Sequence, residues 1–389
     1  MSPGGGPRLS SAWGVNVGTM RRFLIFPLTA VLLALAPAMA GSLAPVPPPG
    51  FIGMSPQGVA DETDYGLMRE AGITSVRMPL NWAEIVPNAA DRRDPEWWWL
   101  DEQVAHAAAH GITIYFFVWG TPDWVSPRLG GEPVASARQR REWLRFLRAA
   151  VMRYGPRGSF WRENRELPRL PVRQWEIWNE ENIVTFSRQP DPERFARLIR
   201  ISGQLLHRLD PGSTVIMGGL FGRPLQIPPN IASDAFLAGV YEIPGIERYF
   251  DGVALHPYVA DAGTMFGQIE ALRRVMGFYG DGETPLYMTE LGWGSDGFES
   301  RWERGPRGQA RELDRAFAML SENRNRWRIG GVWWFSWTDA PGSCQFCDSA
   351  GLLTADREAK PSWYRFNSWT GGDARVVPRA SARALRASP

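Results

Sequence analysis

Cysteine, net charge and long apolar runs are all scarce in this chain of 389 residues. Two cysteines are too few for a disulfide-built scaffold or a cysteine-rich zinc module. The formal charge is +2, from 43 basic and 41 acidic side chains, which excludes the basic domain expected of a nucleic-acid-binding protein. A single long apolar run excludes a multi-span membrane protein. Hydrophobic residues nevertheless make up 44% of the chain, enough for a sizeable core.

Tryptophan, by contrast, is abundant, with 19 residues in the chain. The indole ring is large and flat, so it suits both core packing and stacking against sugar rings. Composition alone therefore makes a sugar-binding protein a working hypothesis.

The amino-terminal region has the pattern of a secretory signal peptide, predicted over residues 20–40. Two arginines precede the apolar stretch 23–37, which is shorter than the ~20 residues of a membrane-spanning helix. Small residues follow, and they predict cleavage after Ala40. Residues 1–19 are then an over-long start, and the mature chain is secreted or extracytoplasmic with no membrane segment. An uncleaved anchor is the alternative.

Cys344 and Cys347 lie three residues apart, and export would permit them to form a disulfide. No second cysteine or histidine pair lies nearby to complete a metal site. A short loop disulfide or two free thiols are therefore favoured over metal binding.

Short β-rich runs alternate with helical stretches after a proline-rich linker at 41–50. The predicted strands are 51–55, 75–80, 112–119, 173–178, 214–218, 252–256, 286–289 and 331–336. Helices are predicted at 94–110, 136–154, 191–209, 265–279 and 309–327. Eight such units predict a single-domain α/β fold, a (β/α)8 TIM barrel over 51–372 with a flexible tail at 373–389. An open doubly wound sheet is disfavoured, because no glycine-rich phosphate turn follows the first strand.

Active sites of such barrels lie at the carboxyl ends of the strands, where this chain has two glutamates. Glu180 follows the fourth strand and Glu290 the seventh, so the two carboxylates are expected to face each other. Such a pair can hydrolyse a glycosidic bond, one group donating a proton while the other attacks the sugar carbon. A separation of about 5–5.5 Å gives retention, and a wider gap gives inversion. A cation keeps the nucleophile ionised, and Arg77 at the second strand is the candidate.

Each of these glutamates taken alone could be a solvated loop residue or an ion-pair partner. Glu176 shares a strand face with Glu180 and is interpreted as a buried, paired residue deeper in the barrel. Glu181 is adjacent to Glu180, and spacing alone does not decide which of the two is the catalytic candidate. Only His256 of the four histidines lies at the predicted rim, which disfavours a metal-dependent hydrolase. Trp119 is expected to stack on a sugar.

Two motifs resemble those of clan A glycoside hydrolases. Residues 175–182 read WEIWNEEN, similar to the Asn-Glu motif of the fourth strand, and residues 287–292 read YMTELG, similar to the nucleophile motif of the seventh. The resemblance extends over about 51–369 and is closest to families 39 and 5.

The resemblance implies a retaining mechanism with Glu180 as acid/base and Glu290 as nucleophile. It implies further that Asn179 holds the 2-hydroxyl of the sugar, while Arg77 and Tyr258 hydrogen-bond the nucleophile. His256 would line the site and Trp337 would form the floor of the central subsite. Family 39 xylosidases carry extra β-structure beyond the barrel, whereas this chain ends soon after its eighth helix, which favours an endo-acting enzyme.

The sequence thus predicts a secreted, monomeric glycosidase that acts on a carbohydrate polymer or oligosaccharide without cofactor or metal. The alternative from another class is a barrel that binds carbohydrate but has lost turnover.

Overall fold

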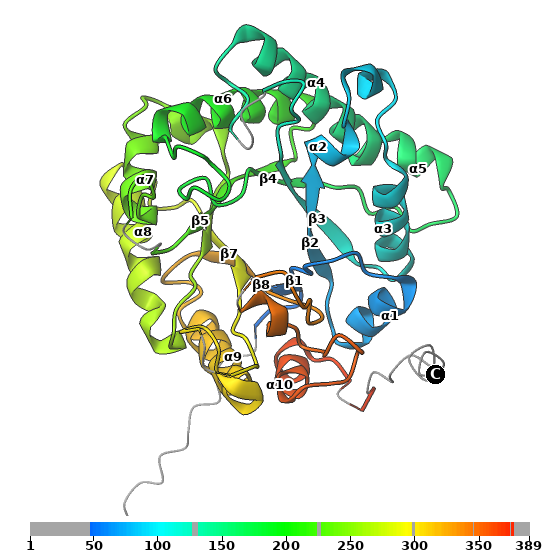
Figure 1. Cartoon of the computed structure of the whole chain (residues 1–389), viewed down its shortest axis with the longest axis vertical. Helices are drawn as coiled ribbons and strands as arrows, with labels where there is room; N and C mark the ends of the chain where they lie inside the picture. Colours follow the sequence, from blue (N-terminus) through cyan, green and yellow to red (C-terminus); the bar gives the residue numbers. More distant parts are fainter. Residues whose placement is uncertain are drawn as a thin grey trace, which may run out of the picture. The chain divides into compact units, whose positions relative to one another are not determined.

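Eight parallel strands form a closed barrel in the order β1 to β8, and helices surround it (Figure 1). The computed structural model describes residues 47–126, 131–223, 227–297, 300–344, 346–373 and 375–376. The predicted signal peptide and most of the predicted tail lie outside these ranges. The prediction of a (β/α)8 barrel is confirmed.

Each of the eight predicted runs overlaps one strand; β2, β5 and β7 extend past their predicted ends, and β8 begins and ends two residues earlier than predicted. The strands are β1 (Ile52–Met54), β2 (Ser75–Asn81), β3 (Thr113–Trp119), β4 (Gln174–Ile177), β5 (Thr214–Phe221), β6 (Gly252–His256), β7 (Leu286–Leu291) and β8 (Ile329–Trp334). Parallel pairing of β1 with β8 closes the ring, so the carboxyl ends of all eight strands meet at one rim.

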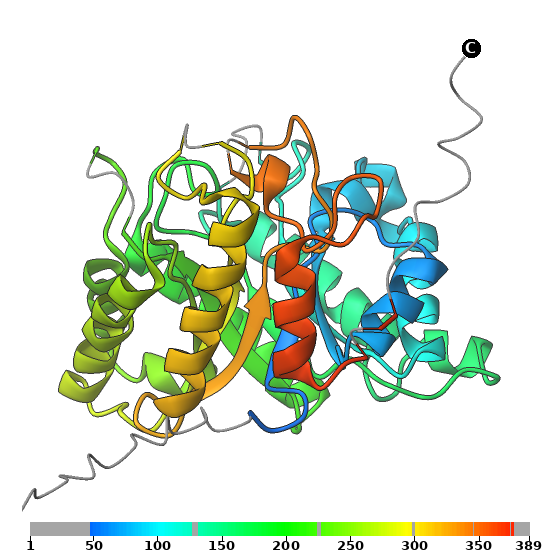
Figure 2. The ribbon, with the colours of Figure 1, turned by 90° about the horizontal axis from the view of Figure 1, so that it is seen from below.

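The α-helices cover the outer surface of the barrel, and Figure 2 shows the last two side by side next to β8. They are α1 (Glu62–Glu70), α2 (Trp82–Ile85), α3 (Trp98–Ala109), α4 (Ala137–Tyr154), α5 (Ser159–Glu163), α6 (Pro192–Leu209), α7 (Ser233–Tyr241), α8 (Phe266–Phe278), α9 (Gly305–Glu322) and α10 (Pro361–Thr370). None of the described helices has the length and apolar character that crossing a membrane requires.

Most predicted helix starts agree with the structure. Asp191 accepts a hydrogen bond from the Arg194 backbone N–H and caps α6, and Ser136 forms a reciprocal capping box at α4. Two predicted starts are wrong: α3 begins four residues after Asp94, at Trp98, and α9 begins at Gly305, four residues before the predicted start at 309. The Glu96 N–H donates instead to the carbonyl of Ile85, which keeps the segment after Asp94 out of α3.

The barrel interior is filled by side chains rather than open. A cluster of Tyr115, Ile216, Ala254, Tyr287 and Trp333 occupies it, with the Tyr115 and Trp333 ring centroids 5.1 Å apart. Gly252 makes room for this packing, because a Cβ there would lie 2.4 Å from the Tyr287 ring. The larger core lies between the strands and the helices. The interior cluster forms a rigid floor below the rim.

Candidate active site

The two predicted carboxylates meet at the carboxyl-terminal rim of the barrel. Glu290 lies on β7, and Glu180 follows β4 by three residues. One carboxylate oxygen of each and one ring nitrogen of His256 all lie within 4.8 Å of one another. Such a short approach is closer to the separation of about 5–5.5 Å of paired carboxyls that attack directly than to the wider gap that admits a water.

An irregular backbone after β4 directs Glu180 toward Glu290. Trp178 and Glu180 have φ angles of 78° and 44°, in the left-handed region that side-chain-bearing residues rarely adopt. The Glu180 N–H donates to the Gly219 carbonyl at 3.1 Å, which anchors this segment to β5. Strand alternation therefore does not set the direction of the Glu180 side chain.

Arg77 on β2 connects most of the site from below. Its guanidinium donates to both oxygens of Glu176, from Nε at 3.0 Å and from Nη2 at 2.9 Å. The remaining contacts reach the rim: Nη2 donates to Asn179 Oδ1 at 2.7 Å and Nη1 to Glu290 Oε1 at 2.6 Å. The Tyr115 hydroxyl also donates to Glu176. Arg77 is fully buried, so its orientation is fixed by these partners.

Glu290 has a hydrogen-bond donor on each oxygen. Arg77 donates to Oε1, and the Tyr258 hydroxyl donates to Oε2 at 2.8 Å. Burial raises the pKa of the Glu290 carboxyl, while the charge of Arg77 and these hydrogen bonds oppose that rise because they stabilise the ionised form. Arg77 and Tyr258 thus stabilise the ionised form of Glu290 against the rise in pKa that burial causes, and they fix the orientation of its two oxygens.

Glu180 has a different environment. Its Oε1 lies 2.8 Å from His256 Nδ1, and His256 Nε2 lies 3.0 Å from the Thr289 hydroxyl. Burial raises the pKa of Glu180 and the nearby charge of Glu290 adds to this, while the contact with His256 opposes the rise. Burial also lowers the pKa of His256, which favours the neutral ring. With no arginine hydrogen-bonded to it, Glu180 is the carboxyl of the pair better suited to hold a proton.

Glu180, His256 and Glu290 are also the described residues whose ligand atoms converge closely enough to hold a metal ion. These atoms already have partners, since His256 pairs with Glu180 and both oxygens of Glu290 accept hydrogen bonds. The Arg77 guanidinium, 2.6 Å from Glu290, would also repel a cation. The donor set thus fits a carboxylate pair better than a metal centre.

A cavity of about 550 Å³ opens above the two carboxylates. Asn179 and Trp119, both predicted site residues, line it together with Glu180, Glu290 and Tyr258. Aromatic rings form much of its wall: Phe117, Trp119, Phe186, Phe221, Tyr258, Phe335 and Phe346. Flat apolar surfaces beside a few polar groups suit the faces and hydroxyls of sugars.

Trp337 does not lie in this cavity, which corrects its predicted role as the floor of a subsite. It is 2% exposed, its Nε1 donates to Asp64 at 3.0 Å, and it packs edge-on against Trp363. Since β8 ends at Trp334, alternation no longer holds at residue 337, and Phe335 lines the cavity instead.

His256 does not line the cavity either. It is fully buried and contacts Glu180 from behind, so its part is to position that carboxyl. Glu176 is buried and paired with Arg77, as predicted. Glu181 is also fully buried, its carboxyl packs against Gly218 and it does not reach the cavity, which separates it from Glu180.

The cavity wall includes the two cysteines, which the structure joins in a disulfide. Phe346 lies between them in sequence, and its ring centroid is 5.0 Å from that of Tyr258. Phe335 and Phe346 were not predicted as site residues, although Phe335 lies in the predicted strand 331–336 and Phe346 lies between the two cysteines. Their proximity to the Cys-Gln-Phe-Cys loop after β8 was the available signal.

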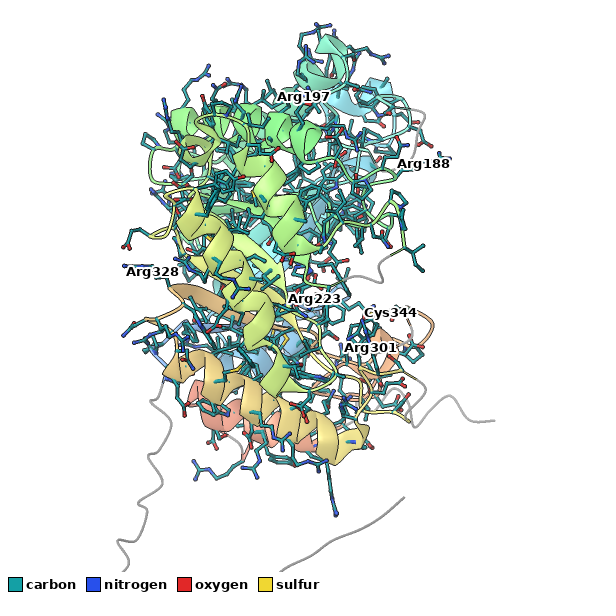
Figure 3. All side chains as sticks on the ribbon, turned by 90° about the vertical axis from the view of Figure 1, so that its left-hand side faces the viewer. Arg188, Arg197, Arg223, Arg301, Arg328 and Cys344 are labelled. Atoms are coloured by element: carbon teal, nitrogen blue, oxygen red, sulfur yellow. A yellow bond between two sulfur atoms is a disulfide. The ribbon has the colours of Figure 1, made fainter. Side chains whose placement is uncertain are left out.

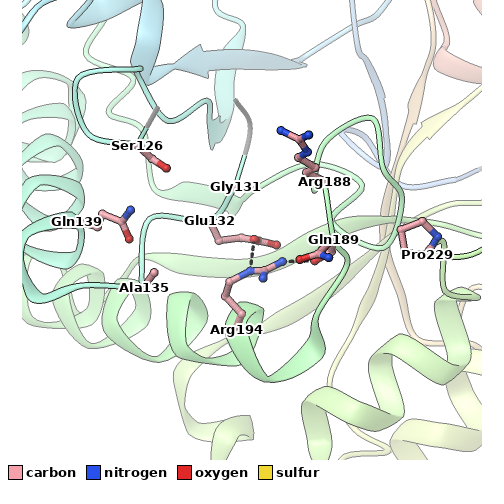
Figure 4. Close-up of a pocket in the computed structure, with 9 residues that line it drawn as sticks. All are labelled: Ser126, Gly131, Glu132, Ala135, Gln139, Arg188, Gln189, Arg194 and Pro229. Atoms are coloured by element: carbon pink, nitrogen blue, oxygen red, sulfur yellow. Dashed lines mark hydrogen bonds and ion pairs between the residues drawn. The ribbon is translucent and has the colours of Figure 1, made fainter. Parts of the chain in front are cut away.

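A second cavity, of about 600 Å³, is shown in Figure 4. Its acidic residue is Glu132, which pairs with Arg194 at 2.7 Å and accepts a hydrogen bond from Ser187 at 3.0 Å. Arg188 and Gln189 also line it. No opposed pair of carboxylates is found among the described residues that line this second cavity, unlike the cavity above Glu180 and Glu290.

No family model matches the chain, and no curated protein matches it. Solved structures do. A family 39 glycoside hydrolase from Bacteroides cellulosilyticus WH2 superposes with a TM-score of 0.60 at 20% identity, over 83% of this chain and 63% of that enzyme. This chain therefore spans less than two thirds of the length of that relative.

Two further enzymes have the same fold. A monomeric beta-xylosidase from Caulobacter crescentus CB15 gives a TM-score of 0.57 at 17% identity, over 83% of this chain and 69% of that one. A GH5_18 enzyme, from glycoside hydrolase family 5, of Bifidobacterium longum subsp. infantis gives 0.54 at 14% identity, over 80% and 72%. The predicted resemblance to families 39 and 5 of clan A is thus confirmed at the level of the fold.

Proposed function

We propose that this protein is a retaining glycoside hydrolase that cleaves an oligosaccharide or polysaccharide. One observation carries the proposal: Glu180 and Glu290 present carboxylate oxygens within 4.8 Å of each other at the rim of the barrel. Double displacement requires one ionised carboxylate and one protonated carboxyl. Arg77 lies beside Glu290 and favours its ionised form, whereas Glu180 is paired with His256.

In the first step, Glu290 attacks the anomeric carbon while Glu180 gives its proton to the departing glycosidic oxygen. A covalent glycosyl ester on Glu290 and a free alcohol result. In the second step, Glu180 removes a proton from water, the water oxygen bonds to the anomeric carbon and the Glu290 ester bond breaks. Two inversions give net retention.

The neighbouring residues support these steps. Arg77 and Tyr258 keep Glu290 ionised and oriented, and His256 contacts one oxygen of Glu180, leaving the other toward the cavity. Since the Asn179 carbonyl accepts a hydrogen bond from Arg77, its amide nitrogen is the group left to donate to a sugar hydroxyl.

We also propose that the enzyme is exported, monomeric and endo-acting. Export is supported by the signal-peptide pattern at 20–40. Endo action is supported by the catalytic cavity of about 550 Å³, which is wide for one sugar and shares Tyr258 with a neighbouring hollow. The length of polysaccharide products and the mass of the enzyme in solution test these points.

Hydrolysis of aryl glycosides and polysaccharides tests the reaction, with the anomeric configuration of the first product followed by proton NMR. Retention is expected. Glu290→Ala should abolish turnover while the chain stays folded, and Glu180→Ala should slow poor leaving groups more than activated aryl ones, because the latter need less acid assistance. Glu181→Ala serves as the adjacent control. Binding without turnover by the wild-type protein would favour a carbohydrate-binding barrel instead, and inverted product would contradict the proposed mechanism.

A further inference from the structure

A hollow of about 310 Å³ adjoins the catalytic cavity. Tyr258, whose hydroxyl donates to Glu290, lines both. The hollow is bounded by the end of β5, by the segment after β6 and by the start of α8, and it contains the side chains of Arg223 and Arg301. A polymer that places one sugar at Glu290 would place a neighbouring unit here.

The hollow has positive charge and no acidic lining residue among those described. Neither Arg223 nor Arg301 has an ion-pair partner in the described part of the chain, although both are exposed at the rim. The acid on the same segment, Asp261, is already engaged, since it accepts a hydrogen bond from the Gly263 N–H at 2.8 Å and faces Arg315 at 3.5 Å.

Two further features favour an anion at this place. Gly267 lines the hollow from the first turn of α8, so the positive end of that helix faces it. The Arg301 guanidinium lies over the Trp302 ring, 4.6 Å from its centroid, and Trp302 contacts Phe221, which contacts Tyr258. A continuous aromatic wall therefore connects Arg301 to the catalytic tyrosine.

Figure 3 shows Arg223, Arg301 and Cys344, a residue of the catalytic cavity wall, at the same end of the barrel, with Arg328 at the other end. Arg328 is paired with Glu283, unlike Arg301. The two unpaired arginines of the hollow thus lie at the rim where substrate arrives.

We propose that the hollow is a subsite for an anionic sugar unit, which Arg223 and Arg301 bind through its carboxylate or sulfate group. The inference rests on the proposed function and names the chemical class of its substrate, an acidic polysaccharide. Guanidinium groups fit such planar or tetrahedral oxyanions with paired hydrogen bonds. They also offset the repulsion that the ionised Glu290 exerts on an acidic polymer.

Affinity electrophoresis of the Glu290→Ala variant tests this without hydrolysis. The probes are glucuronoxylan and alginate, their carboxyl-reduced forms, and a sulfated xylan. We expect retardation by at least one acidic probe and about tenfold weaker binding after carboxyl reduction. Adding Arg223→Ala and Arg301→Ala should weaken binding to the acidic probe about tenfold and leave the weak binding to the reduced probe in place. Preference for sulfated xylan would identify a sulfate ester as the anion.

The matched control is Arg197→Ala, which removes one positive charge from the outer surface of α6. An equal loss of binding in this control, equal losses for acidic and reduced probes, or no binding to any acidic probe would each overturn the proposal. The reaction is scored separately: acidic-probe binding that depends on the two arginines, with no hydrolysis by the wild-type enzyme, would leave the subsite standing and remove the hydrolase. Hydrolysis of neutral probes alone, with no effect of probe charge on binding, would support the hydrolase and remove the anionic subsite.

Discussion

The hydroxyl of Tyr258 offers a sharp test of how Glu290 is kept ready to react. Tyr258→Phe removes one donor from Glu290 Oε2, at 2.8 Å, and leaves the ring in place. The pKa of Glu290 should then rise, because a hydrogen bond to the ionised carboxylate is lost while burial continues to favour the neutral form.

The size of the effect follows from the kind of bond. A hydrogen bond to a charged group contributes about 1.5–3 kcal/mol, and one pKa unit corresponds to about 1.4 kcal/mol. The pKa of Glu290 should therefore rise by about one to two units. Since the carboxylate is the reactive form, the acidic limb of kcat/KM should move to higher pH by the same amount, and kcat/KM below that limb should fall about 10- to 100-fold.

The assay is the pH profile of kcat/KM on an aryl glycoside, with Tyr287→Phe as the control. Tyr287 lies in the barrel interior, and no hydrogen bond of its hydroxyl is found among the described residues. A uniform loss of activity without movement of the acidic limb would show that Tyr258 acts on the substrate rather than on Glu290.

Three other perturbations test the surroundings of the site. Arg77→Met should destabilise the fold by about 3–5 kcal/mol in urea unfolding, because Glu176 and Glu290 lose their buried counterion, and a loss below about 1 kcal/mol would contradict this. Burial raises the pKa of Glu181 well above its ordinary 4.5, so the wild-type fold should lose stability as the pH rises above 4.5. Glu181→Gln should lose less stability over the same range. An equal fall in melting temperature between pH 4.5 and pH 8 for the wild type and the variant would refute a raised pKa for Glu181. Cys344→Ser should lower stability by at most about 2 kcal/mol, since the disulfide closes a short loop, and a larger loss in urea unfolding would be inconsistent with that.

The pattern of apolar residues, together with the turn and capping residues that bound each element, was sufficient to predict the barrel. All eight strands lie where β-rich runs between turn residues predicted them, because a buried parallel strand needs a short apolar run and little else. Helix starts were predictable where a side chain caps the helix, as at Asp191, and failed at Asp94, where a tertiary hydrogen bond from Glu96 to Ile85 decides the path of the chain.

Site residues at the ends of strands were predictable from the sequence, whereas those in or beside irregular loops were not. Motif and strand position were enough to indicate Glu180 and Glu290. The contact of His256 behind Glu180 depends on left-handed backbone at residues 178 and 180, which residue identity does not reveal. The misplacement of Trp337 has the same origin, because beyond the end of β8 no alternation assigns a side chain to one face.

The buried arrangement of Arg77, Glu176 and Tyr115 has an evolutionary consequence. Arg77 and Tyr115 both donate to Glu176, so replacing Arg77 leaves an uncompensated buried charge and replacing Glu176 leaves buried donors without their acceptor. Single mutational steps away from this arrangement are therefore costly, and its members must change together if they change at all. Residues of the rim loops do not depend on one another in this way, so they can change singly. New substrate specificities can therefore arise by substitutions in the loops while the buried residues stay the same.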